Sequence, residues 1–187
     1  MDRGKERKDL EKKGHAIGWA EILLRGLAVL LTLIAAILLA VDKQTEIIPV
    51  QISADLPTFN VPVTAKSSYV SAFVYFVVAN SIACGLGALT LAIALANKGG
   101  GRAFSASRLM IILVDLLMVA LLFSGIGAAG AVGLIGFKGN SHLRWNKVCH
   151  IYGTFCHKVM ASLGVSILGG IAFLILLFLT LLKLSKN

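Results

Sequence analysis

Four long runs of apolar residues divide the chain, and polar segments separate them. The runs cover residues 22–41, 69–96, 109–137 and 159–182. Each run reaches or exceeds the ~20 residues that an α-helix needs to cross a ~30 Å hydrocarbon core. The second and third runs are longer than that, so we expect tilted helices or helix ends that project beyond the lipid. The pattern predicts an all-α membrane protein built as a bundle of four transmembrane helices.

The first run could instead be the apolar part of a cleaved signal peptide. It follows a long basic leader, it exceeds the usual length of a signal-peptide core, and no clear small-x-small cleavage site follows it. We therefore expect this run to be retained as a membrane helix.

The basic residues outside the runs fall unequally on the two sides of the membrane. Residues 1–21, 97–108 and 183–187 lie on one side and hold eleven Lys and Arg residues, whereas residues 42–68 and 138–158 lie on the other side and hold six. Because basic residues concentrate on the cytosolic side, both termini are expected in the cytosol. The two remaining segments then form structured outer loops.

The composition agrees with a bilayer environment. Hydrophobic residues make up 57% of the chain and charged residues 14%, with a mean hydropathy of +0.86. A soluble domain of this length would need more polar side chains to cover its surface. The net charge of +9 comes mostly from residues that flank the apolar runs, where they orient the chain and meet anionic lipid. No nucleic-acid-binding motif competes with this interpretation.

The amino-terminal segment mixes both signs of charge. Asp2, Glu6, Asp9 and Glu11 are interspersed with six basic residues. A segment of this composition is expected to be a solvated, largely disordered arm. Its main role would be to set the orientation, and contact with anionic lipid is the alternative.

The first outer loop, residues 42–68, holds all three prolines of the chain, which are Pro49, Pro57 and Pro62. Prolines at this spacing stop a helix and favour extended or turn geometry. The apolar residues within 47–52 predict a short strand or extended piece before Pro57. We therefore expect an ordered loop that is available for contact outside the cell.

The second outer loop, residues 138–158, carries Cys149 and Cys156. Because compartments outside the cytosol are oxidising, the two thiols predict a disulfide. An uninterrupted helix would hold the two Cα atoms ~10 Å apart, beyond the ~4.4–6.8 Å that a disulfide tolerates. The segment must therefore turn, and Gly153 is the expected place for the turn.

Three aromatic residues accompany this bridge. A disulfide that closes so short a loop stabilises the folded state by roughly 2.5 kcal/mol. We expect the closed loop to hold Trp145, Tyr152 and Phe155 in a fixed outward arrangement, as a contact surface.

Zinc is the alternative use of the two cysteines. His150 and His157 each follow one of them, so two thiolates and two imidazoles are available, but their spacing matches no recognised zinc module. The remaining cysteine, Cys84, lies inside the second run and is expected to be a small buried apolar residue.

Three ionisable residues fall within or at the edge of the runs, namely Glu21, Arg25 and Asp115. Arg25 and Asp115 lie at similar depth, because both of their runs leave the cytosol in the same direction. Each charge alone would cost up to ~2.5–3.5 kcal/mol in the bilayer, so an ion pair between the two helices removes most of that penalty. The alternative has Arg25 reach the cytosolic headgroups and bond Glu21, which leaves Asp115 without a partner.

Two stripes of small residues predict close helix packing. The third run carries Gly125, Ala129 and Gly133, and the fourth carries Ser162, Ser166 and Gly170. Small residues four apart let two helices approach closely, either within the bundle or between protomers.

Taken together, these residues resemble the CASP-like proteins of plants, which are relatives of the Casparian strip membrane domain proteins. The similarity covers essentially the whole chain. The matching parts are WNKVC at 145–149, YGTFC at 152–156, AF at 72–73, YFVVAN at 75–80, and the paired charges Arg25 and Asp115. The segment 54–59 in the first outer loop matches the signature of the Casparian members only in part.

The resemblance implies a four-span bundle similar to that of the animal MARVEL proteins, located in the plasma membrane. It also implies homo-oligomers, and hetero-oligomers with related four-span proteins, that form immobile membrane platforms. In the Casparian members such platforms recruit cell-wall-modifying enzymes.

The sequence therefore predicts a non-enzymatic plasma-membrane scaffold without a cofactor, which associates laterally and organises extracellular cell-wall enzymes. A small channel or transporter subunit is the alternative. The sequence lacks the features that would favour this alternative. It shows no visible pair of repeats, no broken helices in matching halves and no polar stripe through the bilayer. An enzyme is disfavoured because no nucleophile–base pair or metal-ligand set lies at working spacing within a span.

Overall fold

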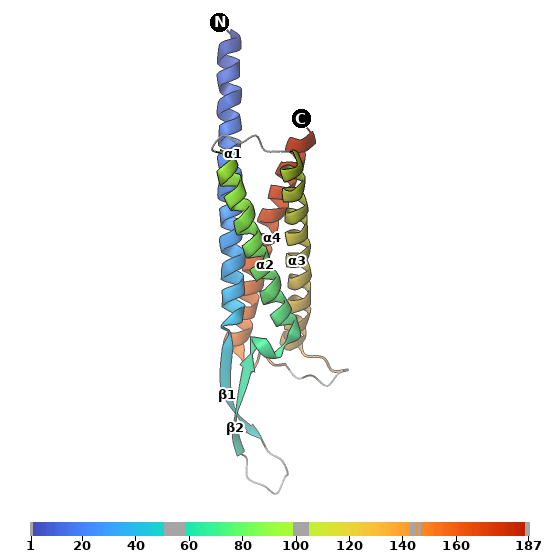
Figure 1. Cartoon of the computed structure of the whole chain (residues 1–187). Helices are drawn as coiled ribbons and strands as arrows, with labels where there is room; N and C mark the ends of the chain where they lie inside the picture. The colour runs from blue at the N-terminus through green and yellow to red at the C-terminus, as the bar shows by residue number, and fades with distance from the viewer. Residues whose placement is uncertain (1, 51–58, 99–104, 143–144, 146, 186–187) are drawn as a thin grey trace.

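The computed structural model describes residues 2–50, 59–98, 105–142, 145 and 147–185. In this part of the chain four long helices stand side by side, and a β-hairpin projects from the end of the bundle opposite the two termini (Figure 1). These are the hairpin end and the terminal end of the bundle. The predicted class, a bundle of four apolar helices, is confirmed.

Each helix is long and apolar enough to cross a bilayer. The helices are α1 (Asp2–Ala40), α2 (Ser71–Lys98), α3 (Ser105–Lys138) and α4 (Gly153–Ser185). Their candidate membrane spans are Gly18–Ala40, Ser71–Ala96, Leu109–Lys138 and Gly153–Ser185. Less than half of each span is buried inside the bundle, so lipid must cover the remaining apolar surface.

Two helices begin six or more residues ahead of the runs that the sequence pattern predicts. α1 begins at Asp2 and extends beyond the rest of the bundle (Figure 1), so the arm that was expected to be disordered is helical. Its many Lys, Arg and Glu residues have high helix propensity, and proline is absent from it. α4 begins at Gly153, ahead of the expected start at 159, because the turn lies at residues 149–151 rather than at Gly153.

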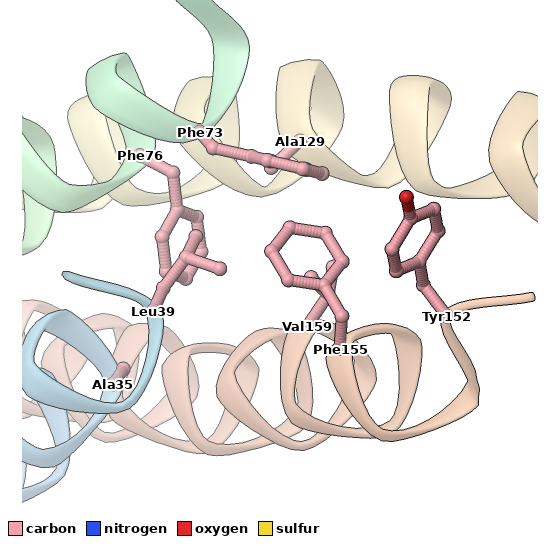
Figure 2. Close-up of a cluster of buried hydrophobic side chains, with 8 residues drawn as sticks. All are labelled: Ala35, Leu39, Phe73, Phe76, Ala129, Tyr152, Phe155 and Val159. Atoms are coloured by element: carbon pink, nitrogen blue, oxygen red, sulfur yellow. The ribbon is translucent and has the colours of Figure 1, made fainter. Parts of the chain in front are cut away.

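The four helices form a square bundle with two apolar clusters at its centre. α1 and α3 both pack against α2 and α4, so α1 and α3 lie diagonally opposite, as do α2 and α4. The cluster at the hairpin end contains Ala35, Leu39, Phe73, Phe76, Ala129, Tyr152, Phe155 and Val159 (Figure 2). The cluster nearer the terminal end contains Ala28, Ala83, Met118, Leu122, Ala172, Phe173 and Leu176.

Both predicted stripes of small residues pack inside the bundle, and of their members only Gly133 is partly exposed. A Cβ atom added at Gly125 would lie 3.4 Å from Ala79 of α2, and one added at Gly170 would lie 3.4 Å from Phe123 of α3. A Cβ at Gly133 would lie 3.7 Å from a side chain of α4. The other members, Ala129, Ser162 and Ser166, are fully buried. Of the two expected uses, the structure therefore shows packing inside one protomer.

The first loop forms an antiparallel hairpin in which β1 (Lys43–Val50) pairs with β2 (Phe59–Lys66). A short 3-10 helix, Ser67–Tyr69, joins β2 to α2. The strand expected before Pro57 is present as β1, although Pro57 itself lies outside the described residues. The second strand was not predicted, because Pro62 lies within it. Each strand of a hairpin keeps one free edge, where the missing N–H of proline is tolerated.

Candidate functional site

Two charged side chains meet at the centre of the bundle, towards its terminal end. Arg25 of α1 donates two hydrogen bonds to the carboxylate of Asp115 of α3, at 2.8 Å from Nη1 to Oδ1 and 2.7 Å from Nη2 to Oδ2. Both side chains are buried. Because α1 and α3 lie diagonally opposite, this bidentate pair crosses the middle of the bundle and fixes the relative depth and rotation of both helices.

A third helix joins this pair through a residue that sequence reasoning missed. Nη1 of Arg25 also donates to Oγ1 of Thr90 at 2.6 Å, and the Thr90 hydroxyl donates to the carbonyl oxygen of Gly87 at 3.0 Å. Thr90 is buried in α2. A threonine in a helix can satisfy its hydroxyl on its own backbone, so its position in an apolar run gave no signal of a second partner.

Glu21 lies at the terminal end and is not the partner of Arg25. Its Oε1 lies 2.6 Å from Nζ of Lys183, in the last turn of α4. The alternative in which Arg25 bonds Glu21 is therefore wrong. Glu21 and Lys183 are both partly exposed, so their ion pair adds little stability. The pair nevertheless holds the end of α4 beside α1.

A second polar contact lies between the two apolar clusters. Oγ of Ser166 donates to Oδ1 of Asn80 at 2.9 Å, and Nδ2 of Asn80 donates to the carbonyl oxygen of Phe76 at 2.9 Å. Ser166 and Asn80 are fully buried. The contact joins α2 to α4, which form the other diagonal of the bundle. In the part of the chain that the structure describes, a buried polar contact therefore joins the two helices of each diagonal.

A disulfide closes the second loop at the hairpin end. Cys149 and Cys156 are bonded, with their Cα atoms 5.6 Å apart. Cys156 lies in the first turn of α4 and Cys149 lies in the turn before it. Both sulfur atoms are bonded to each other, so neither serves as a thiolate ligand, and the described residues hold no group of three or more potential metal ligands. Cys84 is free and partly buried in α2.

Two of the three aromatic residues expected to point outward are buried. Tyr152 and Phe155 are 6% and 7% exposed, whereas Trp145 is 56% exposed. The hydroxyl of Tyr152 donates to the carbonyl oxygen of Val63 in β2 at 3.1 Å. The ring of Phe155 packs against that of Phe73, with the two ring centroids 6.1 Å apart (Figure 2). The expectation failed because the buried rings add large apolar area to the cluster between the helices. Of the three aromatic residues, only Trp145 points outward.

Two side chains at the base of the hairpin fasten it to α4. Oε1 of Gln44 accepts a hydrogen bond from the backbone N–H of Phe155 at 2.7 Å, and this is one of the first-turn amides that a helix leaves without an internal partner. Nζ of Lys158 lies 3.3 Å from Oδ1 of Asp42. Burial raises the pKa of the Asp42 carboxyl, and the ammonium of Lys158 opposes that rise. Sequence reasoning missed both contacts, since the partner of Gln44 is 111 residues away.

Comparison with known proteins agrees with this architecture. A family model of the Casparian strip membrane protein domain matches residues 14–172. CASP-like protein 1E2 of Glycine max is 49% identical over 183 residues, which cover 98% of this chain and 96% of that protein. CASP-like protein 1E1 of Arabidopsis thaliana is 44% identical over 185 residues, which cover 98% of this chain and 93% of that protein. No solved structure matches the chain significantly.

The four apolar helices and the family match together define a multi-pass membrane protein with four spans. The chain belongs to the family that carries the Casparian strip membrane protein domain, and its resemblance to the CASP-like proteins is confirmed.

Proposed function

We propose that the protein is a non-enzymatic scaffold that associates laterally into plasma-membrane domains and organises cell-wall-modifying partners. The observation that carries this proposal is that buried polar side chains of the spans are hydrogen-bonded to one another. In the described part of the spans, Arg25 is bonded by Asp115 and Thr90, and Asn80 is bonded by Ser166. A channel or transporter needs polar groups that face a water-filled route, whereas these groups face one another in a packed interior.

We propose that association between protomers uses surfaces other than the two small-residue stripes, because every member of those stripes except the partly exposed Gly133 is buried inside the bundle. Two kinds of surface remain available. The outward faces of the helices are apolar and meet lipid, and the hairpin end presents β1, β2 and the exposed Trp145. We propose that the first kind serves contacts between copies and related four-span proteins, and the second serves extracellular partners.

The fluorescently tagged protein is expected to form oligomers and to diffuse slowly in the plasma membrane, because a scaffold acts by lateral association. Recovery after photobleaching and chemical crosslinking measure this behaviour, with a monomeric four-span protein under the same tag as the control. Reconstituted liposomes are expected to show no ion current and no saturable solute flux. Free monomeric diffusion together with a saturable flux would replace the scaffold with the transporter alternative.

We propose that both termini lie in the cytosol and that the hairpin end lies outside the cell. The distribution of basic residues supports this orientation. The disulfide gives independent support, because such bonds persist in oxidising compartments and this one lies at the hairpin end.

Protease added to intact cells is expected to leave a tag at residue 1 or residue 187 uncut. A tag inserted near Ser53, which lies outside the described residues in the segment that joins β1 to β2, is expected to be removed. Immunoblotting of each tag gives the result, and permeabilised cells provide the control in which all three tags are cut. Cleavage of a terminal tag on intact cells would reverse the orientation.

A further inference from the structure

An apolar groove of about 820 Å³ opens on the side of the bundle at the hairpin end, between α2, α3 and α4. Phe73, Phe155 and Val159 line it, and these side chains belong to the buried cluster (Figure 2). The volume falls within the ~300–1,000 Å³ typical of ligand sites. Voids in a close-packed interior are rarely larger than a water molecule, so the groove is a feature of the surface and not a packing defect.

Glycines of α3 give the groove its depth. Gly130, Gly133 and Gly136 line it at intervals of three residues, which places them along one side of the helix. A Cβ atom added at Gly130 or Gly136 would meet no atom within 4 Å, and one at Gly133 would make ordinary contact with Val159 at 3.7 Å. The wall is therefore formed by backbone where longer side chains would fill the space.

The mouth of the groove is cationic and lies at the level of the membrane surface. Lys66, at the end of β2, and Lys138, at the end of α3, both line it and are exposed. Tyr69 and Trp145 also line the groove, and they are 73% and 56% exposed. Exposed Trp and Tyr side chains favour the headgroup region of a bilayer, so the two ammonium groups meet headgroups while the apolar part of the groove lies in hydrocarbon.

These features specify a ligand with a long apolar part and an anionic head. None of the described residues that line the groove is acidic, so nothing within the groove neutralises Lys66 and Lys138. Basic pockets beside transmembrane helices bind anionic lipid headgroups. A second copy of the chain fits less well, because a two-fold contact through this groove would bring the same two lysines toward each other.

We infer that the groove binds one anionic phospholipid from the leaflet on the hairpin side, with an acyl chain along α3 and its headgroup between Lys66 and Lys138. The site goes beyond the scaffold function and does not depend on it, because it needs only a membrane-spanning bundle. It makes the protein selective for the lipid composition around its hairpin end.

Tryptophan quenching tests this site, because Trp145 lies at the mouth of the groove and the only other tryptophan is Trp19. The full-length protein carrying Trp19→Phe is reconstituted into phosphatidylcholine nanodiscs. Dibrominated phosphatidylglycerol or dibrominated phosphatidylcholine is then added at equal mole fractions as the quencher. The anionic lipid is expected to quench Trp145 more strongly, and equal quenching by the two lipids would overturn the site.

Charge removal tests the contact with the headgroup. Lys66→Gln and Lys138→Gln are each expected to reduce the preference for phosphatidylglycerol about fivefold, the equivalent of roughly 1 kcal/mol per lysine near a membrane surface. Lys43→Gln is the matched control, since Lys43 is exposed and lies opposite Lys66 in the hairpin ladder but does not line the groove. An equal loss in the control would mean that general surface charge, and not a site, attracts the lipid.

Filling the groove tests the acyl chain. Gly136→Leu is expected to abolish the preference, whereas Gly127→Leu, on the same helix but outside the groove, is expected to leave it unchanged. At both glycines an added Cβ would meet no atom within 4 Å, so the two changes are matched in packing. Equal effects of the two leucines would overturn the site. So would weak quenching by both lipids together with a crosslinked dimer, which would assign the groove to a second copy.

Discussion

Replacing either Arg25 or Asp115 with alanine is expected to lower the free energy of unfolding by about 3–5 kcal/mol, because it leaves the other residue as an unpaired buried charge. Asp115 is 0% exposed and Arg25 is 5% exposed, so water cannot replace the lost partner. The double replacement removes both charges, and its effect is expected to be well below the sum of the single effects.

Unfolding by denaturing detergent from mixed micelles measures all four proteins of this double-mutant cycle. Thr90→Val keeps the side-chain shape and removes the hydroxyl that accepts from Arg25, with an expected loss of about 1–3 kcal/mol. Thr180→Val is the matched control, because the hydroxyl of Thr180 bonds only within its own helix among the contacts described. A strictly additive cycle would show that Arg25 and Asp115 stabilise the bundle through separate partners.

Replacing Cys149 and Cys156 together with serine is expected to lower the free energy of unfolding by roughly 2.5 kcal/mol, because the open chain regains the freedom that the short closed loop removes. The same segment carries Tyr152 and Phe155, which hold the hairpin against α4. We therefore also expect faster proteolysis within β1 and β2 in this variant. Cys84→Ala, away from the bridge, is expected to change neither measurement.

Counting thiols establishes the starting state for that comparison. In denatured, unreduced protein only Cys84 is expected to react with a thiol probe, and all three cysteines are expected to react after reduction. Three reactive thiols before reduction would contradict the disulfide and remove the basis for its stability effect.

The spans and the ion pair could be predicted because the bilayer imposes strong constraints on a sequence. The thickness of the hydrocarbon core sets a minimum length for each apolar run, so the runs were visible without any knowledge of packing. A buried charge in lipid needs a partner. Glu21 was an alternative partner for Arg25, but that choice would have left Asp115 without a partner. Pairing followed from elimination among few charged residues.

The contacts made by uncharged polar residues could not be predicted in the same way. Gln44 and Thr90 are ordinary residues in their local sequence, and each can be satisfied by water or by its own backbone. Their roles depend on partners distant in the chain, the amide of Phe155 and the guanidinium of Arg25. Only the three-dimensional arrangement brings these groups together.

In the second loop the disulfide was predicted correctly, but the orientation of two aromatic side chains was not. The disulfide followed from compartment and spacing, but the outward placement of Tyr152 and Phe155 assumed that the loop stands apart from the bundle. In the structure α4 begins at Gly153, so both residues enter the helix packing, and their burial against Phe73 and β2 becomes favourable. The length of an apolar run defines the start of a helix poorly, and it is the start of α4 that decides whether these two side chains are buried.

The hairpin is fastened at its base. Among the described residues, Asp42, Gln44 and the carbonyl of Val63 make its polar contacts with α4 and with the residue that precedes it. Ile48 and Ala65 add apolar contacts with the buried cluster.

All three positions that make the polar contacts lie in the half of the hairpin nearer the bundle, whereas the pair Val50 and Phe59 lies at the opposite end of the ladder. Because the polar contacts with the helices end at Val63, substitutions farther along the ladder, at Pro49 or Asn60, are expected to leave the packing of the four helices unchanged. The far end of the hairpin can therefore vary in sequence without a change in the membrane bundle.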